Sequence, residues 1–168
     1  ARLIGAAYLI PLCFLLLYKK IEKKYYNNVI VIGVLLFAQA IIGWYMVKSG
    51  LSERVDVSQY RLALHLTMAF IILGLTFYTL VSYLFENNLI NNNSVFIKKY
   101  KGLLIIIFVF ICFQISYGAF VSGTHSGLIY NTWPLYNGNI LPFFENAQTR
   151  WLINFFENGE YIIFIHRT

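Results

Sequence analysis

Two histidines lie near the ends of apolar stretches, where their side chains could bind a metal-containing cofactor. His65 lies about one helical turn inside the run between Arg61 and Glu86, which contains no Asp, Glu, Lys or Arg. His166 lies at the equivalent depth of an apolar segment that starts near Tyr161. A neutral imidazole nitrogen is an axial ligand of heme iron, and ionisable residues at membrane depth are usually functional. The pair therefore suggests heme ligation between transmembrane helices.

The same residue types also allow a structural role. Each histidine could instead hydrogen-bond a backbone carbonyl or a hydroxyl inside a helix bundle. Arg167 follows His166 directly, and Arg61 precedes His65 by one helical turn. A guanidinium can pair with a heme propionate in a fork geometry, or it can extend to the membrane interface. Both interpretations of the arginines stay open on the sequence alone.

Other polar residues give weaker indications. His125 stands among Ser, Gly and Thr, which predicts a solvated loop histidine. Met68 shares a predicted helix with His65 and cannot take the opposite axial position, so we expect it to pack. Glu157 and Glu160 could handle protons or simply start a helix. The sequence contains no Gly-rich phosphate loop and no recognisable nucleophile motif, so any chemistry would be that of a cofactor.

The composition predicts the elements that position these residues. The 168 residues are 59% hydrophobic and 12% charged, with a mean hydropathy of +0.64, which is typical of membrane proteins. Backbone groups in lipid must bond within their own segment, which favours helices. The sequence therefore predicts an all-α integral membrane helical bundle with four transmembrane helices and the start of a fifth near Tyr161. The four predicted spans are residues 3–17, 29–47, 62–85 and 102–121.

The net charge of +6 reflects membrane topology rather than nucleic-acid binding. Lysines cluster at the ends of the apolar segments, and the first and third connections hold more Lys and Arg than the second and fourth. The first and third connections are therefore expected to face the cytoplasm or matrix. Trp44, Trp133 and Trp151 then fall on the outer side. The ends of the two apolar segments that carry His65 and His166 fall on the same side.

The chain divides into three predicted parts. Residues 1–121 hold the remainder of a first four-helix half and the first span of a second. Residues 122–150 form an outer connection, and residues 151–168 start the next helix. A Gln-x-x-x-Gly pattern, followed by Ser-Gly-Leu, occurs near Gln39 and again near Gln114, which suggests a duplication or a chance similarity of apolar segments. The sequence starts at Ala1 and stops within an apolar segment, so we expect a piece of a longer protein.

Several stretches resemble the heme A synthase family. They occur in the family's order along nearly the whole chain: GWYMVKSGL from Gly43, YRLALHL from Tyr60, GAFVSGTHSGLIYNTWPLYNG from Gly118, and FIHR from Phe164. The resemblance implies an eight-helix fold made of two similar four-helix halves. Each half would hold a heme site near the outer face, between two histidines.

The resemblance also implies roles for individual residues. His65 would be the second histidine of the first half, in the catalytic site that binds heme O as substrate. His166 would be an axial iron ligand of heme b, with Arg167 beside that cofactor. The histidines that pair with them, and an essential acidic residue, would lie outside this sequence, so we expect the chain to be inactive alone.

The family's activity is the oxidation of the C8 methyl of heme O to a formyl group. The resemblance therefore implies a place in the bacterial inner (plasma) membrane rather than the mitochondrial inner membrane. Expected partners are membrane lipid, heme O synthase, oxidase assembly factors and further copies of the chain, with no nucleic acid. Two other classes stay open: a b-type electron-transfer cytochrome with His65 and His166 on one heme, and a heme-free transporter or scaffold. The NTWP turn around Trp133 could lie at the interface, cover a heme edge or be purely structural.

Overall fold

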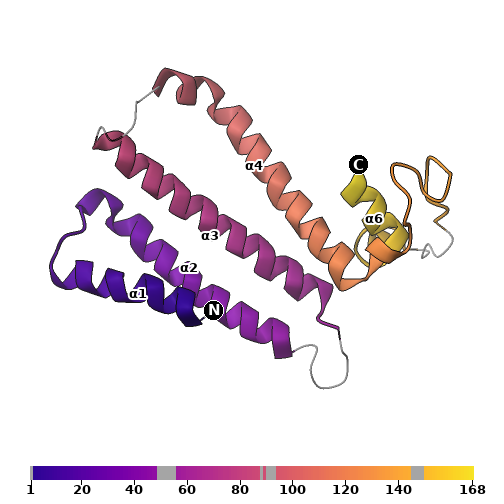
Figure 1. Cartoon of the computed structure of the whole chain (residues 1–168), viewed down its shortest axis with the longest axis horizontal. Coiled ribbons are helices and arrows are strands. Elements are labelled where there is room, and N and C mark those ends of the chain that lie inside the picture. The colour runs from indigo at the N-terminus through magenta and orange to yellow at the C-terminus, as the bar shows by residue number, and fades with distance from the viewer. Residues whose placement is uncertain (1, 49–55, 88, 90–93, 145–149) are drawn as a thin grey trace. The chain divides into compact units, whose positions relative to one another are not determined.

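The computed structural model describes residues 2–48, 56–87, 89, 94–144 and 150–168. These residues form α1 (Arg2–Leu17), α2 (Lys23–Lys48), α3 (Gln59–Glu86), α4 (Ser94–Gly123), the short 3-10 helix η1 (Ser126–Leu128), α5 (Trp151–Glu157) and α6 (Gly159–Arg167) (Figure 1). Within them, the β structure consists of one isolated bridge between Tyr136 and Asn139. The predicted all-α fold class is confirmed.

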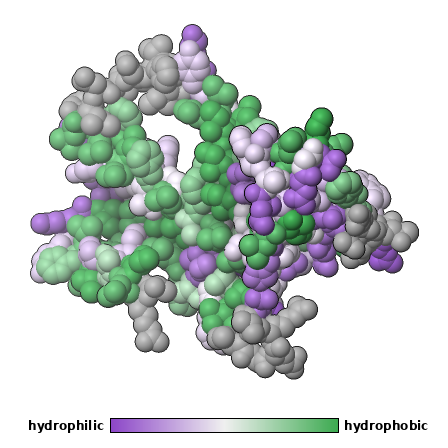
Figure 2. Space-filling model, turned by 45° about the vertical axis from the view of Figure 1, so that its right-hand side comes forward, coloured by the Kyte–Doolittle hydropathy of each residue, from purple (hydrophilic) through white to green (hydrophobic). Residues whose placement is uncertain are grey.

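Three helices of the described chain are long and apolar enough to cross a membrane: α2, α3 and the Lys99–Gly123 part of α4. They correspond to three of the four predicted spans. The remaining predicted span forms α1, which at 16 residues is shorter. Many large hydrophobic side chains on these helices are exposed, and Figure 2 shows hydrophobic residues in green over much of the visible face. Such surfaces are stable only in a lipid-like environment, so the chain is an integral membrane protein.

The chain forms two compact units. The first unit comprises Ala1–Trp44 and Met68–Ile107, and the second comprises Tyr45–Thr67 and Phe108–Thr168. In the first unit a short turn joins α1 to α2, with Lys19 in the left-handed region (φ 51°). The backbone N–H groups of Lys19 and Lys20 donate to Leu16 and Leu15, which satisfies the last carbonyls of α1.

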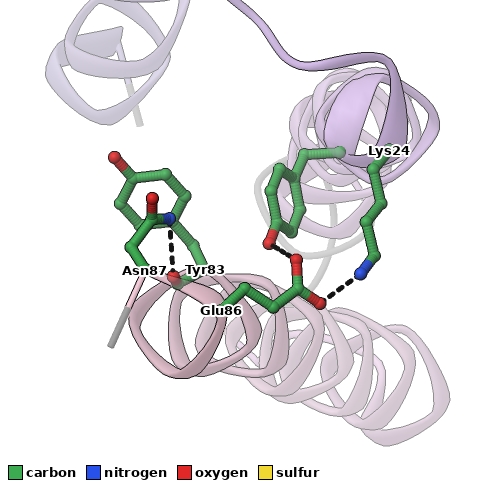
Figure 3. A network of polar contacts seen from close by, with 5 residues as sticks. Lys24, Tyr83, Glu86 and Asn87 are labelled. Carbon is green, nitrogen blue, oxygen red and sulfur yellow. Dashed lines mark hydrogen bonds and ion pairs between the residues drawn. The ribbon is translucent and has the colours of Figure 1, made fainter. Parts of the chain in front are cut away.

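A polar network ties α2 to α3 in the first unit. The carboxylate of Glu86 accepts a hydrogen bond from Lys24, as Figure 3 shows, and another from the hydroxyl of Tyr25. Just after the end of α3, Asn87 Nδ2 donates to the carbonyl of Tyr83 at 2.9 Å. The network therefore joins the beginning of α2 to the end of α3.

The second unit contains both sequence-predicted histidines. Its core consists of residues from α3, α4 and α6: Ala63, Tyr117, Ala119, Phe120 and Ile162. A second cluster joins Tyr130, Tyr136 and Ile163. The chain enters α6 through a break at Asn158, whose side chain accepts from the backbone N–H groups of Glu160 and Tyr161. This N-cap separates α5 from α6, so residues 151–168 form two helices.

Two glycines allow close approaches in the second unit. A Cβ at Gly123 would lie 2.7 Å from Cβ and 2.8 Å from Cα of Gln59, which brings the end of α4 against the start of α3. A Cβ at Gly159 would lie 2.9 Å from Oγ of Ser126, which brings the start of α6 against η1. The approach of α3 to α4 and that of α6 to η1 therefore each depend on the absence of a side chain.

Candidate functional site

His166 lies against the surface of α4 at Gly118. A Cβ at position 118 would be 3.2 Å from Cε1 of His166 and 3.9 Å from each ring nitrogen. Gln114 lies one turn earlier on the same face of α4, and its Nε2 donates to the backbone carbonyl of His166 at 2.8 Å. Gly118 and Gln114 therefore position the imidazole and the end of α6 together.

One ring nitrogen of His166 has no hydrogen-bond partner among the residues that the structure describes. Nδ1 is buried, and none of the residues that the structure describes offers it a hydrogen bond. Buried polar atoms are paired in the great majority of cases, so an unpaired one indicates a partner outside the described protein atoms. A half-buried imidazole with a spare nitrogen fits an axial ligand of heme iron. This histidine is therefore suited to the cofactor that the sequence suggests.

Arg167 binds the outer turn of the chain. Its Nη1 donates to the carbonyl of Thr132 at 3.0 Å, and its Nη2 donates to the carbonyl of Tyr130 at 2.7 Å. The guanidinium also lies 5.3 Å from the ring centre of Tyr136, within cation–π range. A guanidinium carries five N–H donors, so these bonds leave further donors for a carboxylate.

The turn that Arg167 binds is internally bonded. Thr132 Oγ1 donates to the carbonyl of Leu135 and accepts from the N–H of Asn137, both at 2.8 Å. Tyr130 packs edge-on against Tyr136 with ring centres 5.2 Å apart, and both side chains are buried. The side chain of Trp133, in contrast, is 79% exposed and lies outside this buried cluster. The turn is thus a packed structural element with one large exposed aromatic side chain.

Burial changes the acid–base behaviour of the turn. Removal from water raises the pKa of the Tyr136 hydroxyl, and the positive charge of Arg167 partly opposes this rise. Tyr136 is therefore neutral at physiological pH and serves as an aromatic surface for the guanidinium.

His65 lies on α3, and its side chain does not face the same side of α4 as His166 does. Thr67 Oγ1 and Ser116 Oγ are 2.7 Å apart, which defines the faces where α3 and α4 meet. At about 100° per residue, His65 points about 200° away from Thr67 around α3.

The same angle per residue, applied to α4, shows which side of that helix His166 occupies. Gly118, which carries the His166 ring, lies about 200° around α4 from Ser116. His65 therefore points away from α4, whereas His166 lies on the side of α4 that is turned away from α3.

The remaining predicted polar residues occupy separate places. Arg61 Nη1 donates to the carbonyl of Tyr45 at 2.9 Å, and its guanidinium lies 3.6 Å from the centre of the Tyr45 ring. Arg61 therefore binds the last turn of α2, where a cation is favoured by the helix dipole. His125 is exposed, which confirms the predicted loop histidine, and its Nε2 lies 3.1 Å from Oδ1 of Asp56. In the described part of the chain, no three His, Cys, Asp or Glu side chains group as a metal site.

Sequence reasoning missed the residues that position His166. Gln114 was visible only as a member of a repeated Gln-x-x-x-Gly pattern, and Gly118 as a member of that pattern and as the first residue of a stretch that resembles the family. That spacing places both residues on one helix face, which is a detectable sign of a contact surface. The contact of these two residues with His166 on α6 had no sign in the sequence.

Known proteins resemble this chain along its whole length. The sequence profile of a family described as cytochrome oxidase assembly protein matches residues 1–168. The heme A synthase of Wolbachia pipientis wMel is 44% identical, with 99% of this chain and 47% of that protein covered. The heme A synthase of Agrobacterium fabrum is 38% identical, with 99% of this chain and 45% of that protein covered.

A third relative gives the same result. The heme A synthase of Wolbachia pipientis subsp. Culex pipiens is 42% identical, with 99% of this chain and 50% of that protein covered. The chain thus spans about half the length of the curated relatives it matches. No solved structure matches it. Because the family profile covers every residue, this chain belongs to the cytochrome oxidase assembly protein family.

Proposed function

We propose that this chain is part of a heme A synthase, in which His166 is an axial ligand of heme b and His65 belongs to the heme O site. The observation that carries the proposal is the His166 imidazole, which lies on Gly118 with a buried nitrogen that no described residue binds. The names of the relatives support the activity.

The residues around His166 act as positioning groups. Gln114 holds the backbone of His166, and Gly118 leaves room for the ring, so the imidazole is oriented before a ligand arrives. Arg167 holds the turn beside α6 and retains donors for a propionate. When bound, heme b would relay electrons for oxidation of the C8 methyl of heme O to a formyl group.

The separation of the two histidines around α4 favours two sites over one. An axial pair on a single heme must face the same iron from opposite sides. His65 points away from α4, and His166 lies on the side of α4 turned away from α3. This arrangement argues against a cytochrome that uses these two histidines on one heme. Each histidine then needs a second ligand from elsewhere in the full-length protein.

The test uses the full-length protein that contains this chain, purified with its heme. In His166→Ala we expect loss of the low-spin b-type absorption band. In His65→Ala we expect that band to remain, while conversion of heme O to heme A, measured on extracted heme, is lost. His125→Ala is the matched control because that side chain is exposed, and it should retain both properties. Loss of one common band in both His65→Ala and His166→Ala would contradict the proposal and favour a bis-histidine cytochrome.

The proposal extends to the surroundings of the enzyme. We place it in the bacterial plasma membrane, where heme O synthase would supply the substrate and oxidase assembly factors would receive the product. Self-association is part of the same proposal. Co-purification of the tagged full-length protein from its own membranes tests these partners.

A further inference from the structure

The first unit contains a cavity between α1, α2 and α3, separate from the histidine residues. Its volume is about 510 Å³, within the range of small-molecule sites. The walls are mainly apolar and include Leu12, Leu15, Val29, Ile32 and Leu80. An apolar cavity of this size is suited to a hydrocarbon chain.

Three hydroxyl groups that line the cavity are already bonded to the protein. Thr76 and Thr79 each donate to a carbonyl one turn earlier on α3, at 2.8 Å. The hydroxyl of Tyr8 donates to the carbonyl of Val29. These hydroxyls therefore do not call for a polar ligand inside the cavity.

The cavity opens along one face of α1 and at the turn that follows. Ala7, Pro11 and Leu15 recur every fourth residue on α1, line the cavity and remain exposed. A ligand can therefore enter sideways, as lipids do. Lys20 and Glu22 line the cavity where the α1–α2 turn meets it.

The turn carries an excess of positive charge. Glu86 neutralises Lys24, as Figure 3 shows, so this lysine adds little to the field at the turn. Lys19, Lys20 and Lys23 remain against the single carboxylate of Glu22. The charge beside the apolar cavity thus complements an anion.

We propose that this cavity binds an acyl chain of an anionic phospholipid, whose phosphate contacts Lys20. The apolar walls match the hydrocarbon, and the lateral opening matches a ligand that comes from the bilayer. Basic pockets between transmembrane helices bind anionic headgroups, whereas a zwitterionic lipid gains less from the same charge. One ligand then accounts for both the apolar walls of the cavity and the basic turn beside it.

The experiment measures lipid retention. The full-length protein that contains this chain is released from bilayers of equal phosphatidylglycerol and phosphatidylcholine, and retained lipid is counted by native mass spectrometry. We expect preferential retention of phosphatidylglycerol. Lys20→Gln should lower that preference about fivefold, which corresponds to about 1 kcal/mol per basic residue. Lys101→Gln is the matched control, because Lys101 is exposed on α4 and does not line the cavity.

A second pair of variants tests the apolar part. Ala7→Phe places a ring in the cavity and should reduce retention of both lipids, whereas Ala6→Phe, next to it but outside the lining, should not. Equal retention in Ala7→Phe and Ala6→Phe would overturn the proposal. So would an unchanged preference in Lys20→Gln, or a full-length protein that retains no lipid because another segment fills the cavity. Inorganic phosphate should not displace the lipid, since displacement would assign the site to free phosphate.

Discussion

The imidazole of His166 lies within 3.2 Å of the place where a Cβ at Gly118 would stand, so one residue of α4 sets the position of a histidine on α6. The hypothetical Cβ comes nearest to Cε1, with both nitrogens farther away. The ring edge between the nitrogens therefore faces α4. A side chain at position 118 would push against the ring itself.

Gly118→Ala should weaken heme b binding by the full-length protein several-fold. The added methyl would lie 3.2 Å from Cε1, so the ring must move by a few tenths of an ångström, and ligand geometry is sensitive to such shifts. Heme titration followed by the low-spin band measures the change. Gly102→Ala on the same helix is the control, since a Cβ there meets nothing within 4 Å. Equal heme affinities in the two variants would contradict the prediction.

Gly123→Ala should destabilise the second unit by about 1–3 kcal/mol, the usual cost of overpacking. The new Cβ would lie 2.8 Å from the Cα of Gln59, and a backbone atom cannot move without moving α3. Unfolding in detergent measures the loss. In Gly127→Ala the corresponding contact, with Val121 Cγ1, is an ordinary 3.5 Å, so this control should remain near the wild-type stability.

Arg167→Lys should loosen the turn while α6 stays helical. Lysine cannot reproduce the two parallel donors that reach Tyr130 and Thr132, and its ammonium lacks the planar fork. Amide hydrogen exchange of residues 130–139 should speed up several-fold. Arg150→Lys changes an exposed arginine at the start of α5 and should leave that exchange unchanged. Equal protection from amide hydrogen exchange in both variants would contradict the prediction, because it would show that the turn is stable without the hydrogen bonds of Arg167.

Tyr136 should add an alkaline limit to stability. Because burial raises its pKa, the folded state keeps the proton at a pH where the unfolded state has lost it. Its contribution is complete below the unfolded pKa of about 10 and is lost as the pH rises through the folded value. Tyr136→Phe should therefore lose less stability than the wild type between neutral and strongly alkaline pH. Parallel stability curves for the two proteins would contradict this assignment.

The helices that cross the membrane were predictable because apolar length is a local property. The predicted spans 29–47 and 62–85 lie inside α2 and α3, which continue into polar residues at both ends. Those extensions follow from helix propensity and contacts such as Lys24 with Glu86. Their ends could not be fixed by hydropathy alone.

The environment of His166 was predictable only in part. The His166–Arg167 pair was visible as a motif, but the partners of Arg167 lie 35 and 37 residues earlier in a turn. A guanidinium pairs as readily with carbonyls as with a propionate, so residue type could not decide between them. The break at Asn158 did have a sign, since Asn followed by Gly and Glu is typical of a helix N-cap.

The contact between Gln114 and His166 spans 52 residues, and this distance has a consequence for biogenesis. Synthesis proceeds from the N-terminus, so the receiving face of α4 leaves the ribosome well before α6 does. The face of α4 that contacts His166 can therefore be inserted in the membrane while α6 is still being translated. Under the proposed ligation, heme binding at His166 is a late step of assembly, because the short helix α6 reaches α4 only after α4 is in place.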